Sequence, residues 1–110
     1  MRLSTKSKIR AILDRGTRWF SGPLVFRALE DKSSGIKFSV LISKKVSPKA
    51  VVRNRVRRLF RESWRLLQPK VDPGWNILVL LQKEADVQSF KQKEIANWLT
   101  LGLKKKNLLQ

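Results

Sequence analysis

The chain contains no cysteine and no histidine among its 110 residues. Without cysteine it can form neither a disulfide framework nor a thiolate metal site, and a reducing cytoplasm is the expected compartment. Without histidine it lacks the commonest general acid or base and the commonest metal ligand. These two absences leave little material for a self-contained catalytic centre.

Acidic residues and long apolar runs are scarce as well. Only 8 Asp plus Glu oppose 25 Lys plus Arg, which gives a formal net charge of +17. This charge would repel itself in a compact state unless a counter-charged partner absorbs it. No apolar stretch approaches the roughly 18 residues of a membrane span, and the start of the chain does not resemble a signal peptide. We therefore expect a soluble, cytoplasmic protein with no membrane partner, whose first candidate ligand is nucleic acid.

The few acids form no convincing catalytic or metal-binding pattern. Glu30 and Asp31 are adjacent in one apparent loop, and Glu84 and Asp86 lie in another. A polar connection between strands needs such residues in any case. The sequence therefore gives no catalytic residue and no metal ligand.

The length fits a single domain, expected to bind RNA over 1–110, with one modest core. Hydrophobic periodicity predicts the order α-β-β-α-β-α. Strands are expected over 24–29, 35–43 and 76–81, and the polar segment 30–35 should join the first two in a hairpin. Residues 17–23 are predicted as a turn.

The first predicted helix covers 8–15 and ends at Gly16. The central helix should start with Ser47 as N-cap and Pro48 at its first position, and run to about Leu67. The last helix should begin at a capping box over 89–92, and the basic tail 104–110 is a candidate for disorder.

The aromatic residues divide into two groups. One group lies in apolar stripes and is expected in the core: Phe38, Phe60, Phe90 and Trp98. The other group lies near predicted loops: Trp19, Phe20 and Trp75. For this second group, stacking on a nucleic-acid base and a half-buried position agree equally well with the sequence.

The segment 43–65 is the most basic part of the chain, with nine Lys or Arg against one acid. On a helix of about 100° per residue, one face collects Val52, Val56, Leu59, Phe60, Ser63 and Leu67. The opposite face collects Asn54, Arg57, Arg58, Arg61 and Arg65. The planar fork of arginine matches a phosphate group with two hydrogen bonds. One face should therefore pack while the other meets a polyanion.

Asn54 is the odd member of this basic face, because asparagine is a poor helix former. Its amide carries both donors and an acceptor. It therefore suits either hydrogen bonding to RNA edges and sugars or the positioning of an arginine.

The stretch from Ser43 to Glu62 resembles the signature of the bacterial ribonuclease P protein subunit. It reads Ser43-Lys44-Lys45 at a strand end, then Ala50-Val51, then Arg53-Asn54-Arg55-Val56-Arg57-Arg58-Leu59-Phe60-Arg61-Glu62. The resemblance implies an α+β fold in which a small four-stranded sheet packs with three helices in the order α-β-β-(β)-α-β-α. It further implies similarity to the second domain of ribosomal protein S5, with a left-handed β-α-β crossover through the central helix. That hand runs against the usual rule.

The resemblance also implies a function. The family assembles with a catalytic RNA that removes the 5′ leader of precursor tRNA, with Mg²⁺ held mainly by the RNA and one protein expected per RNA. Carried onto this chain, the RNA-binding residues of the central helix are Arg53, Asn54, Arg55, Arg57, Arg58, Arg61 and Arg65. Lys44 and Lys45 would lie beside them at the strand end.

The family binds the single-stranded leader in a cleft between this helix and the sheet, often lined by aromatic residues of the first helix. In this chain Ile9 and Leu13 occupy the matching positions. Arg27, on a strand facing that region, is a cationic candidate. The resemblance therefore implies leader contacts that are mainly apolar and electrostatic.

The sequence leaves three other functions open. A ribosomal or general RNA-binding protein would share the composition, but it gives no reason for Asn54 between two arginines. A metal-dependent nuclease would have to use Glu and Asp and would cleave RNA alone with Mg²⁺. A cationic membrane-active protein usually concentrates its charge on one amphipathic helix, whereas here the charge is spread over several segments.

Overall fold

The structure is a computed structural model that describes residues 6–32 and 37–109. Within these residues it has three α-helices: α1 (Lys6–Arg15), α2 (Ala50–Leu67) and α3 (Gln92–Lys105). Its four strands are β1 (Thr17–Ser21), β2 (Leu24–Glu30), β3 (Lys37–Leu41) and β4 (Trp75–Leu81). Short 3₁₀ turns, η1 (Gln68–Lys70) and η2 (Val87–Ser89), follow α2 and precede α3. The expected α+β class is confirmed, including a fourth strand.

The strands form one mixed sheet in the order β1-β2-β4-β3. β2 pairs antiparallel with both β1 and β4, whereas β3 pairs parallel with β4 after the crossover through α2. The β-α-β unit is therefore present, and its left hand stays a prediction. The expected hairpin between the strands at 24–29 and 35–43 is wrong, because β4 lies between β2 and β3.

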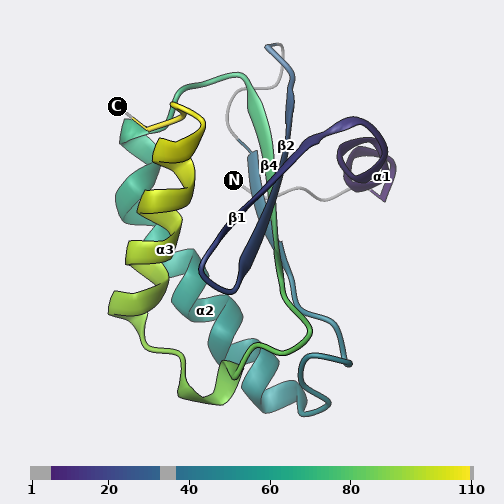
Figure 1. Ribbon diagram of the computed structural model, residues 1–110, viewed down its shortest axis with the longest axis vertical. Coiled ribbons are helices and arrows are strands. Elements are labelled where there is room, and N and C mark those ends of the chain that lie inside the picture. Colours follow the sequence, from purple (N-terminus) through teal and green to yellow (C-terminus); the bar gives the residue numbers. More distant parts are fainter. Residues whose placement is uncertain (1–5, 33–36, 110) are drawn as a thin grey trace.

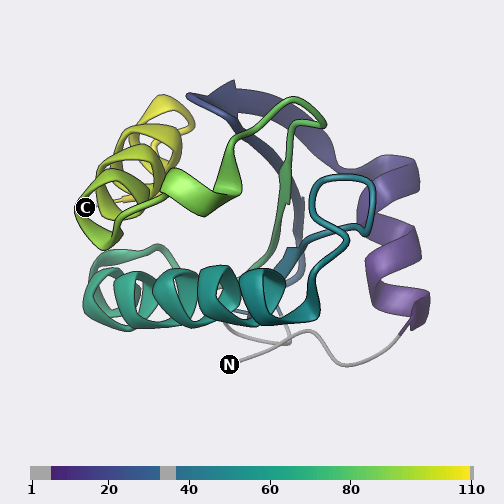
Figure 2. The same ribbon diagram turned by 90° about the horizontal axis from the view of Figure 1, so that it is seen from below.

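The helices cover the two faces of the sheet unequally (Figures 1 and 2). α2 and α3 pack on one face, where Phe26, Val79 and Phe60 belong to the main core. α1 packs on part of the other face, where Ile12 and Leu78 form a smaller buried cluster. β4 is buried along nearly its whole length, as its continuous apolar run predicted. Part of the α1 face is left open beside β1.

The predicted turn at 17–23 is wrong, because Thr17–Ser21 forms strand β1 and only Gly22 and Pro23 turn. Gly22 has a φ of +55°, which an L side chain rarely adopts. Trp19 faces the main core and donates from Nε1 to the Gly102 carbonyl oxygen at 2.8 Å. A Cβ atom at Gly102 would collide with the Phe26 ring, so α3 can approach the sheet only because this residue is glycine.

The helix starts differ from those predicted, although the ends of α1 and α2 agree. α2 begins at Ala50, because Ser47 is buried and its N–H donates to the Ser43 carbonyl oxygen within a turn. α3 begins at Gln92, and its start is closed by the Lys91 N–H donating to Glu94 Oε1 at 3.1 Å. The predicted capping box at 89–92 is therefore shifted by two residues.

The core contains the predicted Phe38, Phe60 and Phe90, and Trp98 is half-buried against it. Trp64 was absent from the predicted apolar face, yet it is buried and stacks on Phe38 with ring centroids 4.3 Å apart.

Residues 104–109 do not form a free tail. α3 continues to Lys105, Leu108 is buried, and the Asp72 N–H donates to the Leu108 carbonyl oxygen at 2.8 Å. Burial of Leu108 therefore holds the end of this segment against the turn that precedes β4.

Across the described ranges, none of the helices combines the length and the apolar character needed to traverse a bilayer.

Candidate nucleic-acid interface

One exposed stripe runs along the outer side of α2. We define the arginine stripe as Asn54, Arg58, Arg61 and Arg65, all exposed and spaced by four, three and four residues. Helical geometry places residues at this spacing on one face. The buried residues of α2 lie on the other side: Val56, Phe60, Ser63 and Trp64. The segregation of packing and charge predicted for the central helix is confirmed.

Two of the predicted RNA-binding arginines make contacts inside the protein. Arg53 Nη1 donates to the Ser47 carbonyl oxygen at 2.9 Å, and Arg55 Nη2 donates to the Phe90 carbonyl oxygen at 2.8 Å. These bonds attach α2 to the connection before it and to the segment before α3. Each guanidinium has five N–H donors, so both residues retain donors for a second partner.

Asn54 positions a neighbouring arginine. Its Oδ1 accepts a hydrogen bond from Arg57 Nη1 at 3.0 Å. This contact matches one of the two roles that the sequence left open for Asn54. Arg57 is half-buried and is thereby held at the flank of the arginine stripe.

Lys44 and Lys45 are both exposed in the turn that follows β3. The Ser43 carbonyl oxygen accepts the N–H groups of Val46 and Ser47, which closes this turn. Because Arg53 bonds to Ser47, the lysine turn is attached to the first turns of α2. The two lysines and the start of the basic helix therefore lie at one end of the molecule.

A second candidate surface lies on the open side of the sheet. We define the sheet-face patch as Arg18, Phe20, Val25 and Arg27, which share one face because side chains alternate along a strand. Phe20 is 46% exposed, and the Arg18 guanidinium carbon lies 5.5 Å from its ring centre. This is a cation–π contact on a surface open to a ligand.

The two arginines of this patch are direct partners across the β1–β2 pair. Like charges facing each other across strands destabilise a sheet unless an anion lies between them. Arg27 Nε is also buried without a hydrogen-bond partner in the described part of the chain. Such an unpaired buried donor is costly in the free protein.

The structure brings together all three leader-cleft candidates. Ile9 and Leu13 pack around the cluster of Ile12 and Leu78, and Arg27 is the direct neighbour of Leu78 across β2 and β4. They lie on the α1 face, whereas the face under α2 is filled by the main core. The open face is therefore bordered by α1, and the arginine stripe is on the opposite side of the sheet. The expected cleft between the central helix and the sheet is wrong, because the main core fills that space.

Phe20 is the residue that sequence reasoning did not place. Its environment follows from the alternation within β1, where Trp19 and Ser21 are buried while Arg18 and Phe20 are exposed. The register continues from Phe20 through Val25 and Leu80 to Leu41, so one partly exposed apolar row crosses the sheet. This row ends near the lysine turn that follows β3.

The other end of the same sheet face is also cationic. The Lys8 amine lowers the pKa of Lys37 through a side-chain hydrogen bond, and desolvation and repulsion from Lys8 act in the same direction. The nearby Asp31 carboxylate acts the opposite way. A bound anion would relieve the repulsion between the two amines.

The described part of the chain has no comparable cluster of metal-ligating side chains. Within residues 6–32 and 37–109, no group of three or more Asp, Glu, His or Cys residues converges to hold a metal ion.

The chain is similar to proteins of one known family. The family model described as Ribonuclease P matches residues 1–105. The chain is 35% identical over 98 residues to the ribonuclease P protein component of Clostridioides difficile, covering 86% of this chain and 85% of that one. It is 33% identical over 95 residues to that of Picosynechococcus sp., covering 84% and 82%. The Staphylococcus aureus RNase P protein has the same fold, with a TM-score of 0.85 at 20% identity over 99% of this chain and 97% of that chain.

Proposed function

The chain belongs to the ribonuclease P protein family, and on that premise we propose that it binds the catalytic RNA through α2 and the 5′ leader of precursor tRNA through the sheet-face patch. Members of this family are protein subunits of an RNA-containing endoribonuclease that matures the 5′ ends of tRNA. The observation that carries the proposal is the presence of two cationic surfaces on opposite sides of one sheet.

The arginine stripe supports a contact with structured RNA. Arg58, Arg61 and Arg65 are exposed on a rigid helix whose other face is buried in the core. Arginine forks at fixed spacing suit the phosphates of a folded RNA, which present charge at fixed positions. Lys44 and Lys45 extend this surface past the start of the helix. Arg53, Arg55 and Arg57 contribute at its border with the donors that their internal bonds leave free.

The sheet-face patch supports a contact with single-stranded RNA. A groove for single strands combines cations that follow the backbone with an aromatic ring on which a base stacks. Here Arg18 and Arg27 provide the cations, and Phe20 provides the ring. Ile9 and Leu13 border this surface from α1 as apolar contacts. Phe20 thereby supplies from β1 the stacking that the first helix lacks.

We assign the chemical step to the RNA rather than to this chain. The chain has no histidine or cysteine, and the described residues form no metal-ligating group. We place Mg²⁺ mainly on the RNA, where it would supply the activated water. One protein would act with one RNA, holding the leader and screening the repulsion between two polyanions.

Reconstitution tests this function. Added to a bacterial ribonuclease P RNA at low Mg²⁺, the chain should accelerate leader removal on the order of tenfold or more, which corresponds to about 1.4 kcal/mol. Polylysine of comparable charge is the control for simple charge screening. Equal stimulation by polylysine, or none by the chain, would favour a general RNA-binding protein. Cleavage by the chain without the RNA would overturn the assignment of chemistry.

A further inference from the structure

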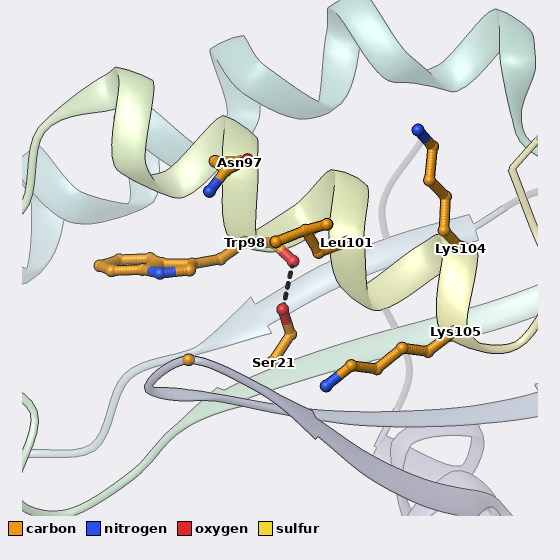
Figure 3. Close-up of a pocket in the computed structure, with 7 residues that line it drawn as sticks. Ser21, Asn97, Trp98, Leu101, Lys104 and Lys105 are labelled. Carbon is orange, nitrogen blue, oxygen red and sulfur yellow. Dashed lines mark hydrogen bonds between the residues drawn. The ribbon is translucent and has the colours of Figure 1, made fainter.

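A groove lies outside both surfaces described so far, between the β1–β2 turn and the outer side of α3 (Figure 3). It has a volume of about 570 Å³ and is lined by Ser21, Gly22, Asn97, Trp98, Leu101, Lys104 and Lys105. This volume is within the range of small-molecule and nucleotide sites.

The walls of this groove are fixed by specific contacts. Ser21 Oγ donates to the Trp98 carbonyl oxygen at 2.8 Å, and Lys105 Nζ donates to the Phe20 carbonyl oxygen at 2.7 Å. A Cβ atom at Gly22 would meet the Trp98 indole ring at 2.6 Å, so the ring packs directly against the turn. Figure 3 shows the Trp98 ring and the Lys105 amine on either side of the Ser21–Trp98 hydrogen bond.

The lining combines apolar surface with positive charge. Trp98 is half-buried and Leu101 is 48% exposed, while Lys104 and Lys105 provide two cations and Asn97 an amide. None of the seven lining residues is acidic. An apolar surface that includes an aromatic ring, next to two ammonium groups, fits a nucleotide whose base covers the apolar part and whose phosphate meets the lysines.

We propose that this groove binds nucleotides of the 5′ leader that lie upstream of those on the sheet-face patch. This inference depends on the proposed leader binding and extends its path. Phe20 and Ser21 are consecutive residues of the edge strand β1, and they face opposite sides of the sheet. A single strand leaving the Phe20 ring therefore reaches the groove by passing around one strand edge.

The position of the groove favours the leader over the RNA bound by α2. α2 lies over β3, where Trp64 stacks on Phe38, whereas α3 lies over β1, where Trp19 bonds to Gly102. β1 and β3 are the two opposite edges of the sheet. The groove therefore continues the sheet-face patch at the β1 edge and is separated from the arginine stripe.

The test compares two precursor tRNAs, with leaders of about 4 and about 12 nucleotides, which span the site sizes of single-strand grooves. The variant is Lys104→Gln with Lys105→Gln. For the long leader, its salt slope should fall by about two and its affinity should decrease, because two phosphate contacts are lost. For the short leader, binding should equal that of the unmodified chain. Unchanged short-leader binding also shows that the variant is folded.

A matched control removes two positive charges at the opposite end of α3. Lys91→Gln with Lys93→Gln changes two exposed lysines that do not line the groove. This control should leave the difference between long and short leaders unchanged. Leu101→Ser tests the apolar part without changing charge, and it should weaken only long-leader binding by about threefold to tenfold.

Three outcomes would overturn the groove proposal. Equal losses of affinity for the two precursors would indicate a general charge effect. No loss of affinity for either precursor would show that the leader does not bind in the groove. If the Lys104→Gln, Lys105→Gln variant binds only the catalytic RNA more weakly, and neither precursor, the groove belongs to the site for that RNA. If instead neither leader binds the unmodified chain better than mature tRNA does, the proposed leader function itself fails.

Discussion

Binding of leader-bearing precursor to the chain in the absence of the catalytic RNA should weaken by about 10³-fold or more between roughly 50 and 200 mM salt. Each phosphate that a cation neutralises releases condensed counterions, so the logarithm of affinity falls linearly with the logarithm of salt concentration. The two surfaces present at least six cations to RNA: Arg58, Arg61, Arg65, Lys44, Lys45 and Arg18. Filter binding or fluorescence anisotropy over a salt series measures the slope, and a flat profile would contradict the electrostatic mechanism.

A pair of single variants connects this slope to individual arginines. Arg58→Ala removes an exposed member of the arginine stripe and should reduce the slope by about one without affecting folding. Arg55→Ala is a contrasting variant from the same helix, because one of its guanidinium donors bonds to the Phe90 carbonyl oxygen. It should lower the free energy of unfolding by about 1 kcal/mol or more. An unchanged slope with reduced affinity for Arg58→Ala would make that residue structural.

Phe20→Ala should weaken binding of the precursor by about fivefold to 150-fold, while binding of mature tRNA stays the same. The range corresponds to about 1–3 kcal/mol for one base stacked on an aromatic ring. The ring is 46% exposed, so its removal should have little effect on the fold. The measurement is the ratio of precursor to mature tRNA affinity.

Phe20→Trp is the matched control, because it retains an aromatic surface and should preserve the ratio. Phe20→Leu keeps apolar area without a π-system and should behave like Phe20→Ala if stacking is the cause. If all three variants bind the precursor as tightly as the unmodified chain does, Phe20 is not part of the leader site.

The elements that could be predicted from sequence are those encoded by local patterns. The arginine stripe follows from helical periodicity, the buried β4 from its apolar run, and the end of α2 near Leu67 from Pro69. The core positions of Phe38, Phe60 and Phe90 follow from the same periodicity.

The features that could not be predicted depend on contacts between distant segments. β1 could not be recognised because Gly22 and Pro23 make the five residues before them resemble part of a turn, and only pairing with β2 makes them a strand. β4 lies between β2 and β3, and no local sequence pattern encodes this strand order or the register of the pairing. Arg53 and Arg55 could not be recognised as partly internal, because their acceptors belong to the Ser47 turn and to the segment before α3.

The charge imbalance gives salt two opposite effects on this protein. Even if all 8 acids were paired, 25 − 8 = 17 cations would remain without an acid. The Arg10–Asp14 pair is 3.7 Å apart with both side chains mostly exposed, so it contributes little stability. Salt screens the remaining repulsion, and the free chain should therefore resist urea better as salt rises, over the same range in which it releases RNA. The bound RNA takes over this screening in the complex, so assembly and folding stability are coupled through the same cations.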